Sequence, residues 1–253
     1  MPDLRWNQEI WDAYDWRAGG EEWSGPWGSS TAQWFTTVLP RLGGVLPARR
    51  VLEIGPGFGR FTRFLVPLAG SYVGVDLSGR CVAACAERFA DHPQATFFQN
   101  DGRSLECVVE QRFDLVFSYD TLVHAEYEVM GAYLSQLVPL LGSSGVAFIH
   151  HSNMGALPQA QSRANRAATV SAEVVEQLVR LSGGRVLIQE TVAWEPETLS
   201  DCYTTFCSAS GHPELQTLYL ADAQAFERET RSARERFQHY LMLGGPPAPT
   251  ESR

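Results

Sequence analysis

The chain has 253 residues and a net charge of −9 with its six histidines neutral, and 44% of its residues are hydrophobic. This length fits one large domain, or one domain with an elaborate cap, and the hydrophobic content allows a sizeable core. All 20 basic residues are arginine. Without lysine there is no Schiff-base enzyme of the pyridoxal-phosphate or aldolase type and no Walker P-loop. The acidic balance also disfavours nucleic acid as a partner.

The cysteines and the N-terminus bear on the compartment. The five cysteines contain no C-x-x-C pair, and the first residues, MPDLRWNQEI, lack the cationic and apolar stretches of a signal peptide. No apolar run approaches the ~20 residues that cross a bilayer. We therefore expect reduced thiols and a cytoplasmic protein that does not bind a membrane.

Short apolar runs alternate with helical patterns from Val51 to about Phe206. The runs are predicted to be buried strands at 51–54, 72–76, 95–99, 113–118 and 146–150. The helices between them are predicted at 60–68, 78–89 and 127–141. Strands separated by helices indicate an α/β fold with a parallel sheet covered on both faces.

The pattern changes after His150. Residues 151–170 are predicted to form an active-site loop or lid, and Ser171 to cap a helix that ends at Leu181. Strands follow at 185–192 and 202–208. Residues 213–240 are rich in arginine and glutamate, which predicts a helix, and the last residues are expected to be disordered.

Residues 1–50 hold six of the seven tryptophans and are predicted to form a helical cap. Most of these indoles are expected to pack onto the sheet, because tryptophan is mostly buried. Trp23 and Trp27 lie in an irregular Gly- and Pro-containing segment. That context leaves two interpretations open for them, core packing or a lid over a ligand.

The segment VLEIGPGFGR (51–60) carries the clearest motif. A predicted strand leads into Glu53, Gly55, Gly57 and Gly59, and a helix follows. Glycines allow positive φ and a close approach of a ligand to the backbone. A dinucleotide fingerprint would need glycine where Arg60 stands. The acid before the glycines suits a ligand with an ammonium group better than a pyrophosphate.

Further polar residues follow the next strands. Asp76 ends the second strand, where a carboxylate can accept ribose hydroxyls. Asp101 and Gly102 follow the third strand, near the place of an adenine, and Tyr119 and Asp120 follow the fourth. Each acid alone fits a solvated turn, but four such features at consecutive strand ends indicate a binding site.

With these motifs (VLEIGPGFG, VGVDLS, FQNDG and FDLVFSYD) the sequence resembles the class I S-adenosylmethionine-dependent methyltransferases over residues 51–206. The resemblance implies a Rossmann-like, seven-stranded, mostly parallel sheet with an antiparallel last strand. It also implies S-adenosylmethionine as cofactor. Its implied contacts are Glu53, Gly55, Gly57 and Gly59 with the methionine part, Asp76 with the ribose and Asp101 with the adenine; we add Trp27, Arg60, Leu77, Gly102 and Tyr119 as further contacts.

Other segments narrow the resemblance. WSGPWGSSTAQWF, HAEYEVM, FIHHSNMG and DCYTTF look like a bacterial branch of natural-product sugar O-methyltransferases, including those of calicheamicin type that act on TDP-rhamnose. The resemblance implies methylation of a hydroxyl on a nucleotide-linked deoxyhexose. The sequence divides on this reading into a cap (1–50), a cofactor-binding domain (51–212) and a C-terminal part (213–253).

An alcohol needs a base or a metal before it attacks a methyl group. Asp120 and His124 follow the fourth strand, His150 and His151 end the fifth, and Asp201 precedes the last. If that strand is antiparallel, these groups converge at one edge. We predict a divalent metal (Mg²⁺, or else Mn²⁺ or Zn²⁺) on Asp120, His151 and Asp201, with His124 or His150 as the base. Adjacent histidines on a strand point to opposite faces, so one of the pair is expected to be structural.

The acceptor is expected to contact Trp23, Asn153 and Arg166, with Arg163 and Arg166 meeting the phosphates of a sugar nucleotide. The alternative is that both arginines face solvent and contact no substrate. Other functions stay open: a methyltransferase for another small hydroxylated or amine metabolite, a non-catalytic binding protein, and an NAD-dependent oxidoreductase, which Arg60 disfavours. A homo-oligomer is also compatible with the sequence.

Overall fold

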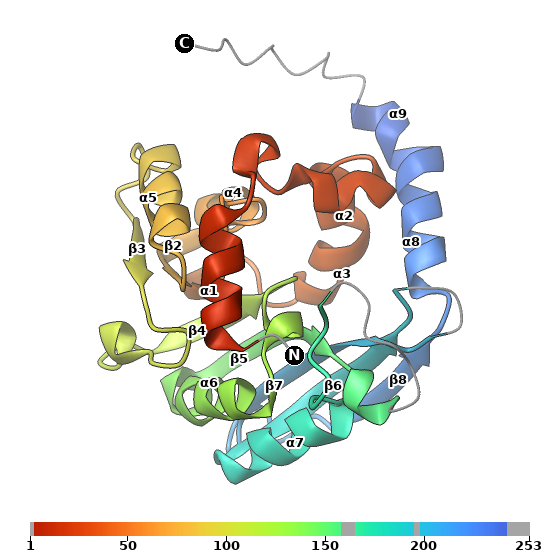
Figure 1. The fold of residues 1–253 in the computed structure, drawn as a ribbon. Coiled ribbons are helices and arrows are strands. Elements are labelled where there is room, and N and C mark those ends of the chain that lie inside the picture. The colour runs from red at the N-terminus through yellow and green to blue at the C-terminus, as the bar shows by residue number, and fades with distance from the viewer. Residues whose placement is uncertain (1–2, 158–164, 195–197, 242–253) are drawn as a thin grey trace.

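The computed structural model describes residues 3–157, 165–194 and 198–241 (Figure 1). The predicted disordered tail beyond residue 241 and Arg163 lie outside these ranges. Within them, no helix combines the length and the apolar character needed to cross a bilayer.

An eight-stranded sheet forms the centre of the fold. Its order is β3-β2-β1-β4-β5-β7-β6-β8, and only β7 runs antiparallel to its neighbours. The strands are β1 Ala48–Ile54, β2 Ala69–Asp76, β3 Ala95–Gln99, β4 Phe113–Ser118, β5 Leu141–Ser152, β6 Gly184–Val192, β7 Asp201–Ser208 and β8 Leu218–Asp222. The mostly parallel Rossmann-like sheet is therefore confirmed, with eight strands instead of seven.

The strand order reverses between β1 and β4, because β2 and β3 lie on one side of β1 and the later strands on the other. In open α/β sheets such a reversal leaves a crevice beyond the carboxyl ends of the two strands. The start of antiparallel β7 meets the end of β5, since Ser152 pairs with Asp201. The predicted convergence of these strand ends is confirmed.

Helices cover both faces of the sheet. The helices are α1 Leu4–Ala13, α2 Ser30–Gln33, α3 Leu39–Leu42, α4 Thr62–Leu65, α5 Gly79–Arg88, α6 Tyr127–Leu140, α7 Ala172–Leu181, α8 Ala225–Ser232 and α9 Gln238–Leu241. Alternation along β1 separates two cores: Leu52 and Ile54 pack with residues of α6 and α7, and Val51 packs with Trp34 and Leu65. Figure 1 shows α1 beside α5, and α8 beside the N-terminal helices.

Several predicted helix signals are present in the structure. The side chains of Ser78 and Ser171 cap α5 and α7 by accepting hydrogen bonds from backbone N–H groups. The predicted helix at 60–68 is instead a short α4 followed by a 3₁₀ turn that contains Pro67. Proline has no N–H and cannot continue the α-helical hydrogen bonds.

Two segments differ from the sequence-based prediction. Residues 218–222, expected to be helical, form β8 and pair in parallel with β6. Their apolar run Leu218–Leu220 extends the sheet, and the charged helix begins only at Ala225. In addition, β5 continues through His151 and Ser152, so the predicted loop begins two residues later.

Candidate functional site

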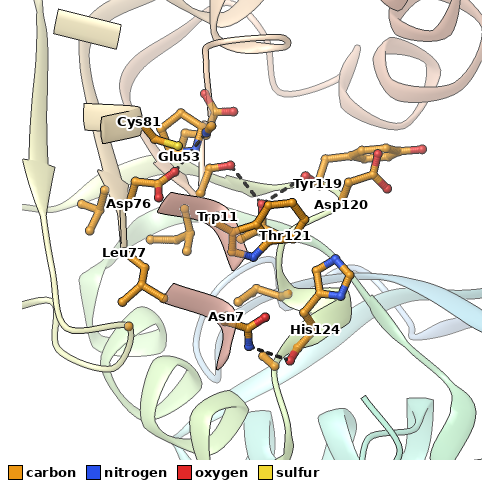
Figure 2. A pocket seen from close by; sticks show the side chains of 18 of the residues that line it. Asn7, Trp11, Glu53, Asp76, Leu77, Cys81, Tyr119, Asp120, Thr121 and His124 are labelled. Atoms are coloured by element: carbon orange, nitrogen blue, oxygen red, sulfur yellow. Dashed lines mark hydrogen bonds between the residues drawn. The ribbon is translucent and has the colours of Figure 1, made fainter. Parts of the chain in front are cut away.

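A cavity lies at the carboxyl ends of β1, β2 and β4, under the N-terminal segment (Figure 2). It holds about 960 Å³ of space not filled by atoms, including open solvent at its mouth. The lining includes the predicted residues Trp23, Glu53, Gly55, Gly57, Arg60, Asp76, Leu77, Gly102, Tyr119, Asp120 and His124.

The glycine turn after β1 forms the floor of the cavity. Gly55 and Gly57 have φ of 72° and 57°, which L-residues rarely adopt. A Cβ on Gly55 would lie 2.1 Å from Cγ2 of Thr121, and the Thr121 hydroxyl donates to the Gly55 carbonyl at 2.9 Å. Only glycine therefore allows the ends of β1 and β4 to approach this closely.

Glu53 lines the cavity from β1 and is almost completely buried. Burial raises its pKa to about 7, although the hydroxyl groups of Tyr72 and Thr62 donate hydrogen bonds to it. A carboxyl group with a pKa near 7 is partly protonated at neutral pH, and it loses its proton and becomes negatively charged when a cation binds beside it.

Asp76 ends β2, the strand beside β1. Its carboxylate accepts hydrogen bonds from the N–H groups of Gly57, at 3.0 Å, and of Ser78, at 2.9 Å. Burial nevertheless raises its pKa to about 6. The side chain thus ties the glycine turn to the end of β2 and presents an acid to the cavity.

Three predicted cofactor residues do not line the cavity. Asp101 is exposed, and its carboxylate accepts from the N–H groups of Arg103 and Ser104, so it stabilises a turn. Gly59 packs against Phe89. Trp27 is 1% exposed in a separate apolar cluster, where its indole donates to Thr37. For Trp27 the core interpretation is the one that the structure supports.

The N-terminal segment supplies an aromatic wall made of Trp23, for which a lid role was left open, and of two tryptophans that were expected to pack in the core. Trp11 and Trp16 line the cavity with Trp23, and Trp16 stacks on Phe58 of the glycine turn with ring centroids 4.6 Å apart. Leu4, Asn7 and Thr121 are further lining residues that were not predicted. The density of tryptophan in residues 1–50 was the available signal, but it did not show which rings face the ligand.

His124 lines the cavity beside the Trp11 ring, with centroids 5.4 Å apart. Its Nδ1 lies 2.9 Å from the Asn165 carbonyl oxygen. A carbonyl can only accept, so Nδ1 carries the proton and Nε2 holds the lone pair. Burial lowers the pKa of His124 to about 4, which keeps the ring neutral near neutral pH.

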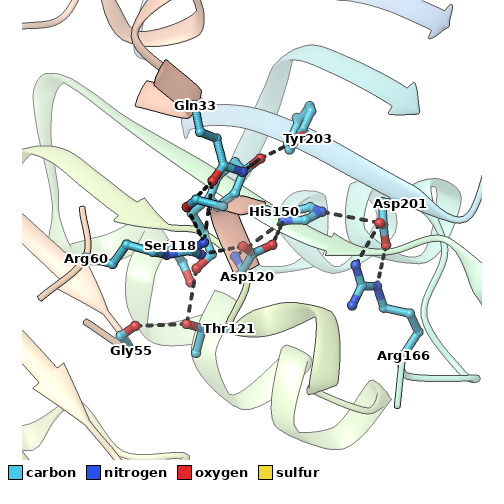
Figure 3. Close-up of polar contacts among 12 residues, drawn as sticks. Gln33, Gly55, Arg60, Ser118, Asp120, Thr121, His150, Arg166, Asp201 and Tyr203 are labelled. Carbon is cyan, nitrogen blue, oxygen red and sulfur yellow. Dashed lines mark hydrogen bonds and ion pairs between the residues drawn. The ribbon is translucent and has the colours of Figure 1, made fainter. Parts of the chain in front are cut away.

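A chain of buried charges runs from the cavity wall into the sheet (Figure 3). Arg60 pairs with Asp120, and an Asp120 oxygen lies 3.1 Å from Nδ1 of His150. Nε2 of His150 lies 3.7 Å from Asp201, which accepts two hydrogen bonds from Arg166, at 2.8 and 3.0 Å.

The alternating signs fix the ionisation of this chain. Burial opposes charge on both acids, but Arg60 and His150 together outweigh it and hold the pKa of Asp120 well below its usual range. Arg166 and His150 together lower the pKa of Asp201 to about 2. Burial also opposes the imidazolium of His150, yet the two carboxylates raise its pKa. Asp120 is the member of the carboxylate pair that reaches the cavity.

The predicted metal site is not assembled. His151 points to the face opposite His150, with Nδ1 2.8 Å from the Ser152 carbonyl and Nε2 2.8 Å from the Thr204 hydroxyl. Asp120 and Asp201 are each neutralised by an arginine. Among the described residues no group of three or more His, Cys, Asp or Glu side chains is arranged to hold a metal. The donor set therefore does not fit the expected ion.

The two other predicted acceptor residues also lie away from the cavity lining. The Asn153 amide donates to the Leu199 carbonyl, and its oxygen accepts from the Ala172 N–H, so it joins two loops. Arg166 is buried against Asp201 and lies over the Trp194 ring. Neither side chain is placed to bind a phosphate in this cavity.

The comparisons with known proteins agree with this geometry. Residues 51–145 match a family model described as a methyltransferase domain. Ribosomal RNA small subunit methyltransferase A of Geobacter sulfurreducens is 38% identical over 68 residues, which are 26% of this chain and 25% of that protein. The corresponding protein of Parasynechococcus marenigrum is 34% identical over 106 residues, 40% of this chain and 34% of that one. The matched region thus spans only a quarter to a third of these relatives.

Solved structures resemble the fold over about three quarters or more of the chain. An S-adenosylmethionine-dependent methyltransferase from Clostridium acetobutylicum has a TM-score of 0.60 at 12% identity, covering 76% of this chain and 96% of that one. The N-methyltransferase NodS of Bradyrhizobium japonicum, in complex with S-adenosyl-l-homocysteine, has a TM-score of 0.59 at 17% identity, covering 81% and 98%.

Fold and comparisons together define the class. The chain has the class I S-adenosylmethionine-dependent methyltransferase fold. More particularly, its residues 51–145, which hold the glycine turn and most of the cavity floor, match the methyltransferase domain.

Proposed function

We propose that the protein is an S-adenosylmethionine-dependent methyltransferase that acts on a hydroxyl group of a small metabolite. The observation that carries the proposal is the cavity at the reversal of strand order, which joins the Glu53–Gly55–Gly57 turn to Asp76. S-adenosylmethionine, when bound, supplies a methyl group on a positively charged sulfur.

The lining residues fit such a cofactor. The positive-φ glycine turn lets a ligand contact the backbone, and Asp76 offers a carboxylate to two ribose hydroxyls. Glu53 supplies negative charge to an ammonium or sulfonium group of the cofactor. Leu4 and Leu77 provide apolar contact for its adenine ring. Asp120 adds an ionised carboxylate, paired with Arg60, to the wall.

His124 is the proposed general base. It is neutral, its Nε2 lone pair is not used by the Asn165 contact, and it lines the cavity on the side of Asp120 (Figure 2). A neutral imidazole can remove the proton of a hydroxyl group as the oxygen attacks the methyl carbon. His150 is buried behind Asp120 and does not line the cavity, so its proposed role is to hold the Asp120 carboxylate.

A sugar is the acceptor class that we favour. The aromatic wall of Trp11 and Trp23 offers flat apolar faces on which the C–H groups of a hexose can pack. Arg60 is the cationic side chain among the described lining residues, and Asp120 already neutralises it. A nucleotide-linked deoxyhexose would therefore bind with its phosphates outside this cavity.

An amine acceptor is the second candidate. Glu53, which is not paired with an arginine in the described contacts, can give the cavity negative charge, and one structure of similar fold is the N-methyltransferase NodS. RNA, the substrate named for the curated relatives, fits poorly with a net charge of −9.

The test combines binding with an acceptor panel. Calorimetry should show one site for S-adenosylmethionine, and incubation with labelled cofactor should methylate free sugars or sugar nucleotides in preference to amines. A His124→Gln variant is expected to lose about 100- to 10,000-fold in kcat while cofactor Kd is unchanged. His92→Gln, which changes a histidine outside the cavity lining, is the matched control. Absence of cofactor binding would refute the proposal.

A further inference from the structure

A short segment anchors His124 from outside the cavity. Asn165 contributes the carbonyl oxygen that receives the Nδ1 proton of His124, and it adopts a left-handed φ of 56°. Its side chain is exposed, so no packing of that side chain holds the carbonyl in place. Among the described residues, those that follow Asn165 hold this carbonyl in place.

The next two residues are firmly attached. Arg166 makes a bidentate contact with Asp201 through Nε, at 2.8 Å, and Nη2, at 3.0 Å. The N–H of Ala167 donates to the Val123 carbonyl at 2.8 Å, and its own carbonyl accepts from the Ser152 hydroxyl at 2.7 Å. The peptide unit that carries the Asn165 carbonyl is thus tied to β7 through the Arg166 side chain.

These contacts close a ring with the chain of charges described above. Asp120 and His124 both belong to the segment after β4, and Asp120 leads through His150 to Asp201. Asp201 leads through Arg166 and its preceding carbonyl back to His124. Two members of the ring, Asp120 and His124, line the cavity. A ring of this kind restricts the position of each member more than separate contacts would.

We infer that Arg166 and Asp201 are positioning residues, which hold the Asn165 carbonyl so that His124 keeps its proton on Nδ1 and its lone pair on Nε2. The inference rests on the proposed role of His124 as the base. It also gives a role to the buried Arg166–Asp201 pair, which is too far inside the protein to contact a phosphate in the cavity. The Arg166 charge acts in the same direction, because it helps to keep His124 neutral.

The tautomer can be observed directly. Protein labelled with ¹⁵N-histidine gives separate Nδ1 and Nε2 signals for each imidazole, and His124→Gln identifies those of His124. In the wild type we expect the Nδ1–H form near neutral pH. In Arg166→Gln and Asp201→Asn we expect the Nε2–H form to become populated and kcat to fall by up to about 100-fold. The pKa of His124 should rise in Arg166→Gln, which removes a positive charge, and fall in Asp201→Asn, which removes a negative one. Cofactor Kd should not change.

Glu190→Gln is the matched control. Glu190 receives Arg41 in the same bidentate way, at 2.8 and 2.7 Å, and is similarly enclosed, but neither residue lines the cavity. This variant should lower stability without changing the His124 signals. If Arg166→Gln does not fold, Arg166→Lys keeps the charge but loses the bidentate contact, and a smaller change in the same direction is expected.

The outcomes separate the inference from the function on which it rests. Unchanged His124 signals in both Arg166→Gln and Asp201→Asn would overturn the inference, whatever happens to activity. Changed signals with unchanged kcat would support the positioning role and refute His124 as the base. Changed signals together with lower kcat would support both.

Discussion

Replacement of Gly55 by alanine tests the glycine turn on which the cavity depends. At a φ of 72° an L-residue costs about 1–2 kcal/mol relative to glycine. The added Cβ would also lie 2.1 Å from Cγ2 and 2.4 Å from Oγ1 of Thr121. Thr121 must then move, which loses its hydrogen bond to the Gly55 carbonyl and adds about 1–3 kcal/mol of packing cost. We expect a total loss of about 2–5 kcal/mol in the free energy of unfolding.

Gly183→Ala provides the control for the backbone part. Gly183 has a φ of 81°, and a Cβ there would meet nothing within 4 Å. Its cost should therefore be the backbone cost alone, about 1–2 kcal/mol. Urea unfolding of both variants and the wild type gives the difference, which measures the collision with Thr121. Gly55→Ala should also bind S-adenosylmethionine more weakly, whereas Gly183→Ala should bind it normally. Equal stability and equal cofactor binding in the two variants would refute the reasoning.

Three further predictions concern charge and metal. Burial raises the pKa of Glu53 from 4.5 to about 7, so the unfolded chain loses this proton first as pH rises. The contribution of Glu53 to stability should therefore fall by about 3 kcal/mol between these pH values. In urea titrations across pH, Glu53→Gln should remove this part of the slope and leave the part that comes from Asp76, whose pKa is also raised. The pKa values of Glu53 and Asp76 are both raised, so both side chains gain negative charge as pH rises from about 5 to about 7. Calorimetry should therefore show affinity for cationic S-adenosylmethionine increasing over this range, and more steeply than affinity for S-adenosylhomocysteine, whose sulfur is uncharged. Parallel slopes for the two ligands would contradict this prediction. Chelation of divalent metals should leave methyl transfer unchanged. His151→Gln should lower thermal stability without affecting cofactor binding, because among the described contacts that imidazole bonds only to Ser152 and Thr204.

The strand ends were the most predictable part of the site. A parallel sheet brings the carboxyl ends of its strands to one edge, so Glu53, Asp76 and Asp120 could be placed together from short apolar runs alone. The antiparallel direction of β7 was implied only by the resemblance to the methyltransferases, and it places Asp201 at the same edge. What these patterns do not contain is the direction of the loops that follow. Asp101 therefore stabilises its own turn instead of facing the cavity.

The N-terminal segment was harder for a different reason. Six tryptophans in residues 1–50 predict burial, but an indole is equally buried by a core and by a ligand cavity. In the structure Trp27 packs in a buried apolar cluster, whereas Trp11 lines the cavity. The distinction depends on how α1 crosses the sheet edge, which is a tertiary property. The strand β8 was missed because charged residues nearby outweighed the short apolar run Leu218–Leu220.

The metal prediction failed because a sequence shows carboxylates without showing which cation neutralises each of them. In a chain without lysine, a buried carboxylate needs an arginine, a histidine, a metal or a proton. For Asp120 the answer was contained in the strand order. Since β1 and β4 are neighbours, the residue after the glycine turn of β1 must lie near the residue that follows β4, and these are Arg60 and Asp120. No such rule links Arg166 to Asp201, because a long connection after β5 brings the arginine back to the sheet. Sheet topology thus predicts the first ion pair, and only the three-dimensional structure reveals the second.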